Sequence, residues 1–488
     1  MRYGMNPGWK DAMGRILIIP AALLLMVPFA LGAQDFASTS DVTFDPEDVT
    51  FSKHIAPILQ RSCQNCHNPV GVAPMSLVTY QEVRRFSRRI KERTAIRDRM
   101  GAMPPWYVEK NIGIQEYKQD TSLSDEELAM IAAWADNGTP EGDPADLPPA
   151  REFDDSGEWT IRPDLVVSSE EILVRGSDAD WWGEIESIPL GLEEDRYVAA
   201  VQVREVNDVK SNQDDGRETV GGRYIVHHMI WRTQVPDTRR ITSWPVHEVG
   251  RNPDLFDQDA GRLLRAGSEI ASESIHLHSN GRDTRARLEI AFELHPIGYE
   301  PKYRGGITSL ANGSDIDIEA NESGQRLDAY TVTQQHTKII SFEPHLHAPG
   351  ERMCLEAIWG FKAETLSCAG YDHNWVRTYV FADDHQPLLP KGTILHITGY
   401  MNNTETNQNI PDPRNWQGSG NRSVANMFID LGERVGLTDE QFVEEMAERV
   451  EKFNLTKNDY VIGCPLCLAT VPTPPAKVTD DASGTQPN

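Results

Sequence analysis

The sequence predicts a multidomain protein in which a small all-α domain is followed by two all-β sandwich, jelly-roll-like domains. A chain of 488 residues is too long for one ordinary hydrophobic core. Apolar residues with helical spacing are concentrated in residues 46–140. Between residues 158 and 435, short alternating or β-branched segments recur between clusters of Gly, Asn, Asp and Pro, which is typical of β-sandwiches.

The expected boundaries follow changes in composition along the chain. They are 1–33 for a signal peptide, 46–140 for the helical domain, 141–157 for a Pro-rich linker, 158–310 and 311–435 for the two sandwiches, and 436–488 for a C-terminal helix, a C-x-x-C segment and a disordered tail. The clearest expected strands are Tyr197 to Val203, Arg223 to Thr233, Arg287 to Leu294, Lys338 to Phe342 and Thr393 to Thr398.

The N-terminal residues indicate export. A basic stretch, an apolar run from Ile16 to Leu31 and the small residues Gly32-Ala33 form the pattern of a cleaved signal peptide, so we expect a periplasmic or secreted bacterial protein. An uncleaved membrane anchor is the alternative, and after cleavage we expect no stable membrane span. The net charge of −27 falls to about −29 without residues 1–33. A surface this acidic argues against nucleic acid as a partner.

Cys63-Gln64-Asn65-Cys66-His67 is a C-x-x-C-H pattern, which attaches haem c through two thioethers and supplies the histidine as an iron ligand. A disulfide between Cys63 and Cys66 is the alternative. The sixth iron ligand should be a methionine from the segment that follows. We expect Met103, because Pro104 and Pro105 stiffen the backbone beside it, with Met75 as the runner-up.

The residues around this motif predict two helices. Phe51, Ile55 and Leu59 have helical spacing before it, and a second helix opens at the capping box Ser124-x-x-Glu127 and stops at Asn137-Gly138. An N-terminal helix, a haem motif, an irregular middle and a C-terminal helix together resemble a small class I cytochrome c. This resemblance identifies the expected all-α domain.

The predicted strands carry histidines at or near their ends. They are the adjacent pair His227-His228, the H-x-H pair His276 and His278, His295 before a glycine turn, and the H-x-H pair His345 and His347. Residues i and i+2 of a strand share a face, whereas neighbours meet only at a bulge, a twist or a strand end. Met401 and Met427 follow as possible soft ligands.

This ordered series resembles the copper type II, ascorbate-dependent monooxygenase family, which includes peptidylglycine α-hydroxylating and dopamine β-monooxygenases. It is similar to a bacterial branch with an N-terminal cytochrome c. The resemblance implies two copper ions. The first would be held by His227, His228 and His295, with His276 and His278 as rivals for the third place, and the second by His345, His347 and Met427. The acidic residue that precedes the family's methionine is absent here, where Asn426 precedes Met427.

The resemblance implies an exported oxidoreductase that hydroxylates a C–H bond of a small organic or peptide-like substrate with dioxygen. Two electrons per turnover would come from an external donor, ascorbate-like or a periplasmic redox protein, and we expect the haem to pass them to the first copper. One alternative is an electron-transfer or copper-binding protein without oxygenase activity. Another is a zinc protein, although a methionine would be an unusual zinc ligand.

The remaining cysteines suggest structural roles. Cys354 and Cys368 flank an expected hairpin and should form a disulfide. Leu437 to Phe453 reads as an amphipathic helix capped at Thr438. Cys464-Pro465-Leu466-Cys467 lacks a following histidine, so we favour a short disulfide between these cysteines.

We expect the loop Asn402 to Arg422 to form a wall of the predicted copper site.

Overall fold

The computed structural model describes residues 44–69, 71–153, 159–179, 181–209, 223–307, 310–360, 362–420 and 425–455. The expected signal peptide, Cys464, Cys467 and the tail lie outside the described residues. From Phe44 onward the chain forms one compact unit. No helix within the described ranges is long and apolar enough to cross a membrane.

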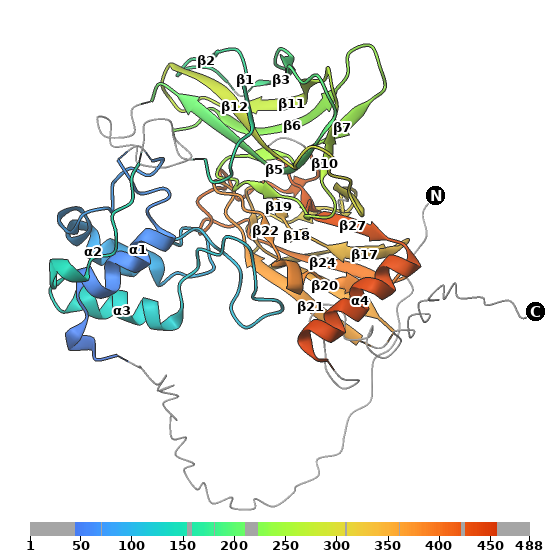
Figure 1. Ribbon diagram of the computed structural model, residues 1–488. Coiled ribbons are helices and arrows are strands. Elements are labelled where there is room, and N and C mark those ends of the chain that lie inside the picture. Colours follow the sequence, from blue (N-terminus) through green and yellow to red (C-terminus); the bar gives the residue numbers. More distant parts are fainter. Residues whose placement is uncertain are drawn as a thin grey trace, which may run out of the picture. The chain divides into compact units, whose positions relative to one another are not determined.

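The N-terminal part contains three of the four α-helices in the described chain. A π-helical turn (Phe51–Ile55) runs into α1 (Ala56–Ser62), and α2 (Tyr80–Thr94) and α3 (Asp125–Asp136) follow (Figure 1). The capping box of Ser124 and Glu127 starts α3 as predicted. Helix α2 was missed, because its region was expected to be irregular. Its own capping box, Thr79-x-x-Glu82, was the available signal.

The predicted fold class is contradicted, because the helices do not form a separate all-α class I cytochrome c domain. The segment between α2 and α3 belongs to a β-sheet core: Trp106, Tyr107 and Ile114 are buried together with Leu355 and Phe381. Its backbone bonds directly to strand β21 (Lys362–Gly370), through Glu109 N to Cys368 O at 2.9 Å and Ile114 N to Leu366 O at 2.9 Å. Trp106 packs edge-on against Tyr379 at 5.2 Å between ring centroids.

Residues 165–294 form two antiparallel sheets around one core. The first contains β1 (Leu165–Ser168), β2 (Ile172–Val174), β5 (Arg196–Asn207), β9 (Asp254–Leu255), β10 (Arg262–Leu264) and β12 (Thr284–Leu294). The second contains β3 (Trp181–Gly183), β4 (Ile188–Pro189), β6 (Val226–Gln234), β7 (Ile241–Ser243), β8 (His247–Glu248) and β11 (Glu269–Leu277). We call this part the first β region. Its core is filled by large side chains such as Trp231 and Phe292.

Residues 304–437 form the second β region, which contains smaller sheets. One sheet joins β16 (Gln325–Val332), β24 (Ile394–Met401), β20 (Gly350–Trp359) and β21, and another joins β13 (Arg304–Ile307), β27 (Glu433–Leu437), β17 (His336–Ile339) and β23 (Leu388–Leu389). A third contains β14 (Leu310–Ala311), β26 (Phe428–Asp430) and β19 (Pro344–Leu346). The short pairs are β15 (Asp317–Ile318) with β25 (Gln417–Gly418) and β18 (Ser341–Phe342) with β22 (Tyr379–Val380).

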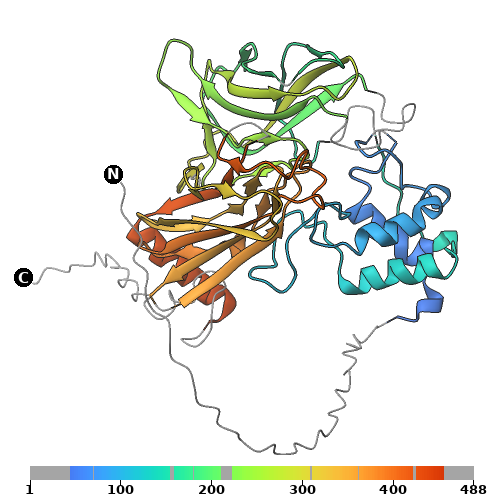
Figure 2. The same cartoon turned by 180° about the vertical axis from the view of Figure 1, so that it is seen from behind.

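Two predicted features of this region are confirmed. Cys354 and Cys368 form a disulfide across the β20–β21 hairpin, where they are paired in register. Helix α4 (Asp439–Phe453) begins after the cap Thr438, and its Phe442 and Met446 bury against Val435 and Leu437 of β27. Figure 2 shows α4 lying along this region from the opposite side to Figure 1.

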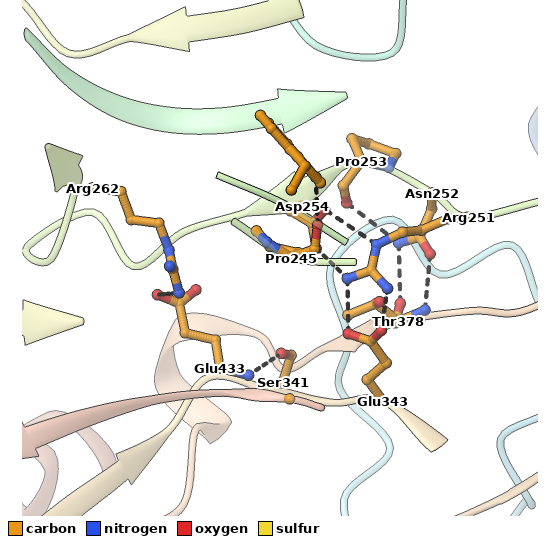
Figure 3. Close-up of polar contacts among 12 residues, drawn as sticks. Pro245, Arg251, Asn252, Pro253, Asp254, Arg262, Ser341, Glu343, Thr378 and Glu433 are labelled. Carbon is orange, nitrogen blue, oxygen red and sulfur yellow. Dashed lines mark hydrogen bonds and ion pairs between the residues drawn. The ribbon is translucent and has the colours of Figure 1, made fainter. Parts of the chain in front are cut away.

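The two β regions are joined by a buried ion pair (Figure 3). Arg251 binds both carboxylate oxygens of Glu343, one of them through Nη2 at 2.7 Å, and it also holds Asp254 at 2.6 Å. The side chains of Arg251 and Glu343 are 4% and 2% exposed. Beside them, Asn252 and Thr378 exchange two hydrogen bonds of 3.0 Å, and Arg262 lies 3.6 Å from Glu433.

Replacing Arg251 by Ala should lower the free energy of unfolding by about 3–5 kcal/mol, because the buried Glu343 and the partly buried Asp254 lose their counter-charge. Chemical denaturation measures this change. The matched control is Arg88→Ala, which removes an exposed ion pair with Glu92 and should leave stability nearly unchanged. Equal small effects of both substitutions would show that the junction does not depend on Arg251.

Candidate metal centre

His227, His228 and His276 form the first imidazole group. Each offers a ligand atom, and these atoms all lie within 4.8 Å of one another. The Nδ1 atoms of His227 and His228 are 3.3 Å apart. Adjacent strand residues can converge because the β6–β11 ladder is irregular here: His276 pairs with His228, and the next residue, Leu277, pairs with Val226. His227 is therefore the extra residue of a bulge, which turns its ring to the side of His228.

The structure does not bring His295 into this group. Its ring stacks on Tyr299 at 3.7 Å between centroids, beside Gly261. The third position beside His227 and His228 is occupied by His276, the rival from the preceding segment. His278 lies next to the group, with its ring 5.3 Å from that of His227 and its Nε2 3.1 Å from the Tyr224 carbonyl oxygen. The ligand role of His295 stays a prediction that its position does not favour.

His345, His347 and Met427 form the second group. Strand β19 carries His345 and pairs with β26, which follows Met427. His345 Nε2 lies 3.2 Å from Met427 Sδ, and the rings of His345 and His347 are 5.4 Å apart. His347 Nδ1 donates to the Ala425 carbonyl oxygen at 2.7 Å, which leaves Nε2 as the nitrogen available to a metal. The structure thus brings together all three residues expected at the second copper.

Glu248 touches the second group from the first β region, and sequence reasoning missed it. Its Oε1 lies 2.5 Å from His345 Nδ1, and both side chains are buried. Strand β8 places Glu248 directly opposite His228 on β6, so one carboxylate lies between a ligand of each group. No local motif surrounds this glutamate, and the contact depends on how the two regions meet.

His373 is the second residue that sequence reasoning missed. Its ring lies 5.1 Å from that of His227 and 6.0 Å from that of His347, so it contacts both groups. The Nδ1 atom of His373 is buried without a hydrogen-bond partner. It follows β21 in the segment that also carries Thr378 of the junction. The two groups are therefore contiguous, although they come from different β regions.

Burial keeps most of these imidazoles neutral. It lowers the pKa of His228 and of His347 to about 3 and that of His373 to about 4, with neighbouring histidines adding to the effect for His347 and His373. The pKa of His227 falls further for the same reasons. Burial would also lower the pKa of His345, but the negative charge of the adjacent Glu248 raises the value overall. Neutral imidazole is the form that binds metals.

The donor sets fit copper. The first group offers three neutral imidazoles, and the second offers two imidazoles and a thioether. Imidazole suits copper, zinc and other divalent metals, whereas a thioether selects soft Cu(I). The close contact of His345 with Glu248 and the hydrogen bond from His347 to Ala425 restrict the ring orientations, as outer-shell partners do in metal sites.

The C-x-x-C-H segment has features that fit an attached haem. Cys63 and Cys66 are free cysteines, and His67 Nδ1 lies 3.1 Å from the carbonyl oxygen of Met75, which leaves Nε2 available to iron. The role of Met75 as the alternative sixth ligand stays a prediction. Met103 is 36% exposed, and its role as sixth ligand stays a prediction.

The loop after β24 approaches the second group. Asn407 Nδ2 donates to the Ala348 carbonyl oxygen at 3.0 Å, and Asn402 N donates to that of Pro349 at 2.7 Å. These bonds hold residues 402–407 against the segment that follows His347. The role of the loop as a wall of the site stays a prediction.

The choice between His276 and His295 is testable by metal content. His276→Ala should reduce the number of coppers bound per chain by one, because the first group keeps only two of its clustered imidazoles. His295→Ala serves as the matched control and should leave the count unchanged, since this ring stacks on Tyr299 outside the group. The reverse result would restore His295 as the ligand.

Comparisons with known proteins give no assignment. No family model and no curated protein matches the chain. Among solved structures, it is similar to N-glycanase F (PNGase F), with a TM-score of 0.26 and 8% identity over 57% of this chain and 96% of that one. It is also similar to the VP2 subviral particle of infectious bursal disease virus, with a TM-score of 0.13 and 10% identity over 57% of this chain and 72% of that one. Likenesses this distant carry no argument about fold or function.

Proposed function

We propose that this chain is an exported copper-dependent monooxygenase that hydroxylates a C–H bond of an organic substrate with dioxygen. The observation that carries the proposal is the pairing of two different donor sets at one junction. Three imidazoles lie on one side, and two imidazoles with the Met427 sulfur 3.2 Å from His345 lie on the other. The proposal also rests on the sequence resemblance to copper type II, ascorbate-dependent monooxygenases.

The two donor sets suit different tasks. Three imidazoles suit a copper that accepts and passes on one electron, whereas a thioether favours Cu(I), the oxidation state that meets dioxygen. Copper, when bound, would supply one-electron chemistry in both groups and oxygen activation in the second. The protein orients the ligands through Glu248 and Ala425 and buries His345 and His347, which limits the access of water.

We further propose that a haem attached at Cys63 and Cys66 delivers electrons to the first group. A short series of contacts supports this route. Arg223 Nη1 donates to the Gly71 carbonyl oxygen at 3.3 Å in the loop after His67, and the next residue, Tyr224, accepts from His278 Nε2 at 3.1 Å. The His278 ring is 5.3 Å from that of His227. The external donor would be ascorbate-like or a periplasmic redox protein.

His347→Ala should abolish reductant-dependent oxygen uptake by the copper-loaded chain and leave the haem spectrum intact, because it removes a ligand of the second group only. An oxygen electrode with ascorbate, together with the absorbance spectrum, measures both. His385→Ala is a matched control, since this partly exposed histidine lies 3.9 Å from Glu116 and takes no part in either group. Oxygen uptake that survives His347→Ala would refute the assignment. Two bound coppers without any uptake would favour an electron-transfer protein.

Reduced haem should reoxidise faster in the copper-loaded chain than in the copper-free chain when dioxygen and candidate substrates are present. Stopped-flow absorbance of the haem measures the two rates. The control is Cys66→Ser with Cys63→Ser, which should lose covalently attached haem. Equal reoxidation rates with and without copper would show that the haem does not feed the copper groups.

A further inference from the structure

The Glu248 carboxylate places one oxygen against a histidine of the second group and buries the other without a hydrogen-bond partner. Oε1 lies 2.5 Å from His345 Nδ1, while Oε2 is buried without a hydrogen-bond partner. The side chains of His345 and Glu248 are 9% and 4% exposed. A buried carboxylate needs a compensating positive charge, and its cost is high without one.

The turn that carries Glu248 is fixed by the junction. Arg251 N donates to the Glu248 carbonyl oxygen at 3.0 Å, and Gly250 has φ of +81°, a conformation that favours glycine. A Cβ at Gly250 would lie 2.4 Å from the Trp375 ring. The side chain of Arg251 then binds Glu343, two residues before His345. Both ends of the Glu248–His345 contact are thereby anchored to the same ion pair.

We propose that Glu248 is a positioning residue of the second metal group: its carboxylate orients His345 across the junction and supplies the negative charge that stabilises Cu(II) there. The inference rests on the proposed copper binding. The second group is then complete only when strand β8 of the first β region lies against it.

The negative charge of Glu248 would affect a bound copper ion in a way that the orientation of the His345 ring alone would not. His345, His347 and Met427 are neutral ligands, so a bound Cu(II) carries more uncompensated charge than a bound Cu(I). One carboxylate nearby favours the more highly charged ion. Glu248 would therefore offset the preference of the thioether for Cu(I) and allow the second group to hold either oxidation state.

Two substitutions separate orientation from charge. Glu248→Gln keeps an amide oxygen that can accept from His345 Nδ1 but removes the charge, and Glu248→Ala removes both. The matched control is Glu433→Gln, another buried carboxylate, which lies 3.6 Å from Arg262 and touches neither group. Competition with chelators measures the affinity of the full chain for Cu(I) and for Cu(II). The copper binding that is lost in His347→Ala is assigned to the second group.

Glu248→Gln should weaken Cu(II) binding at the second group by about 10–100-fold and weaken Cu(I) binding much less. Glu248→Ala should weaken both, and Glu433→Gln neither. Unchanged Cu(II) affinity in Glu248→Gln, or equal losses for both ions, would overturn the role of Glu248 while the proposed function stands. A wild-type chain that binds no copper would contradict both the proposed function and this inference.

Discussion

The buried pair of Arg251 and Glu343 is the interaction on which the rest of this structure depends. Its charges come from different β regions, and burial makes each of them costly without the other. Glu343 leads directly into His345, while the turn before Arg251 carries Glu248. One ion pair therefore fixes the register between a strand that bears a candidate ligand and the carboxylate that orients it.

This junction forms the candidate metal centre from both β regions. Two imidazole groups that lie far apart in the sequence become neighbours, with Glu248 and His373 placed between them. The N-terminal part is also attached to the β core, because its middle segment hydrogen-bonds to β21 and buries Trp106 in that core. The C-x-x-C-H segment and the two histidine groups thus belong to one compact unit.

Features that depend on a few neighbouring residues could be predicted from the sequence. Helix caps, the disulfide hairpin and the convergence of His345 with His347 follow from spacing alone. The position of His276, and not His295, beside His227 and His228 does not follow from spacing, because it depends on the bulged pairing of β6 with β11. Glu248 and His373 each reach the centre as single residues without a motif. The helical domain was mispredicted because the apolar run at Trp106 gave no sign that it pairs with a distant strand.

The central claim is that the two donor groups meet at one junction, and electron paramagnetic resonance of the chain loaded with two Cu(II) ions tests it most directly. Rings of the two groups are linked through His373 at 5.1 and 6.0 Å, so the two spins should interact and alter the spectrum at low temperature. Spectra of His228→Ala and His347→Ala supply the isolated signals. A doubly loaded spectrum equal to the sum of these two would contradict the account.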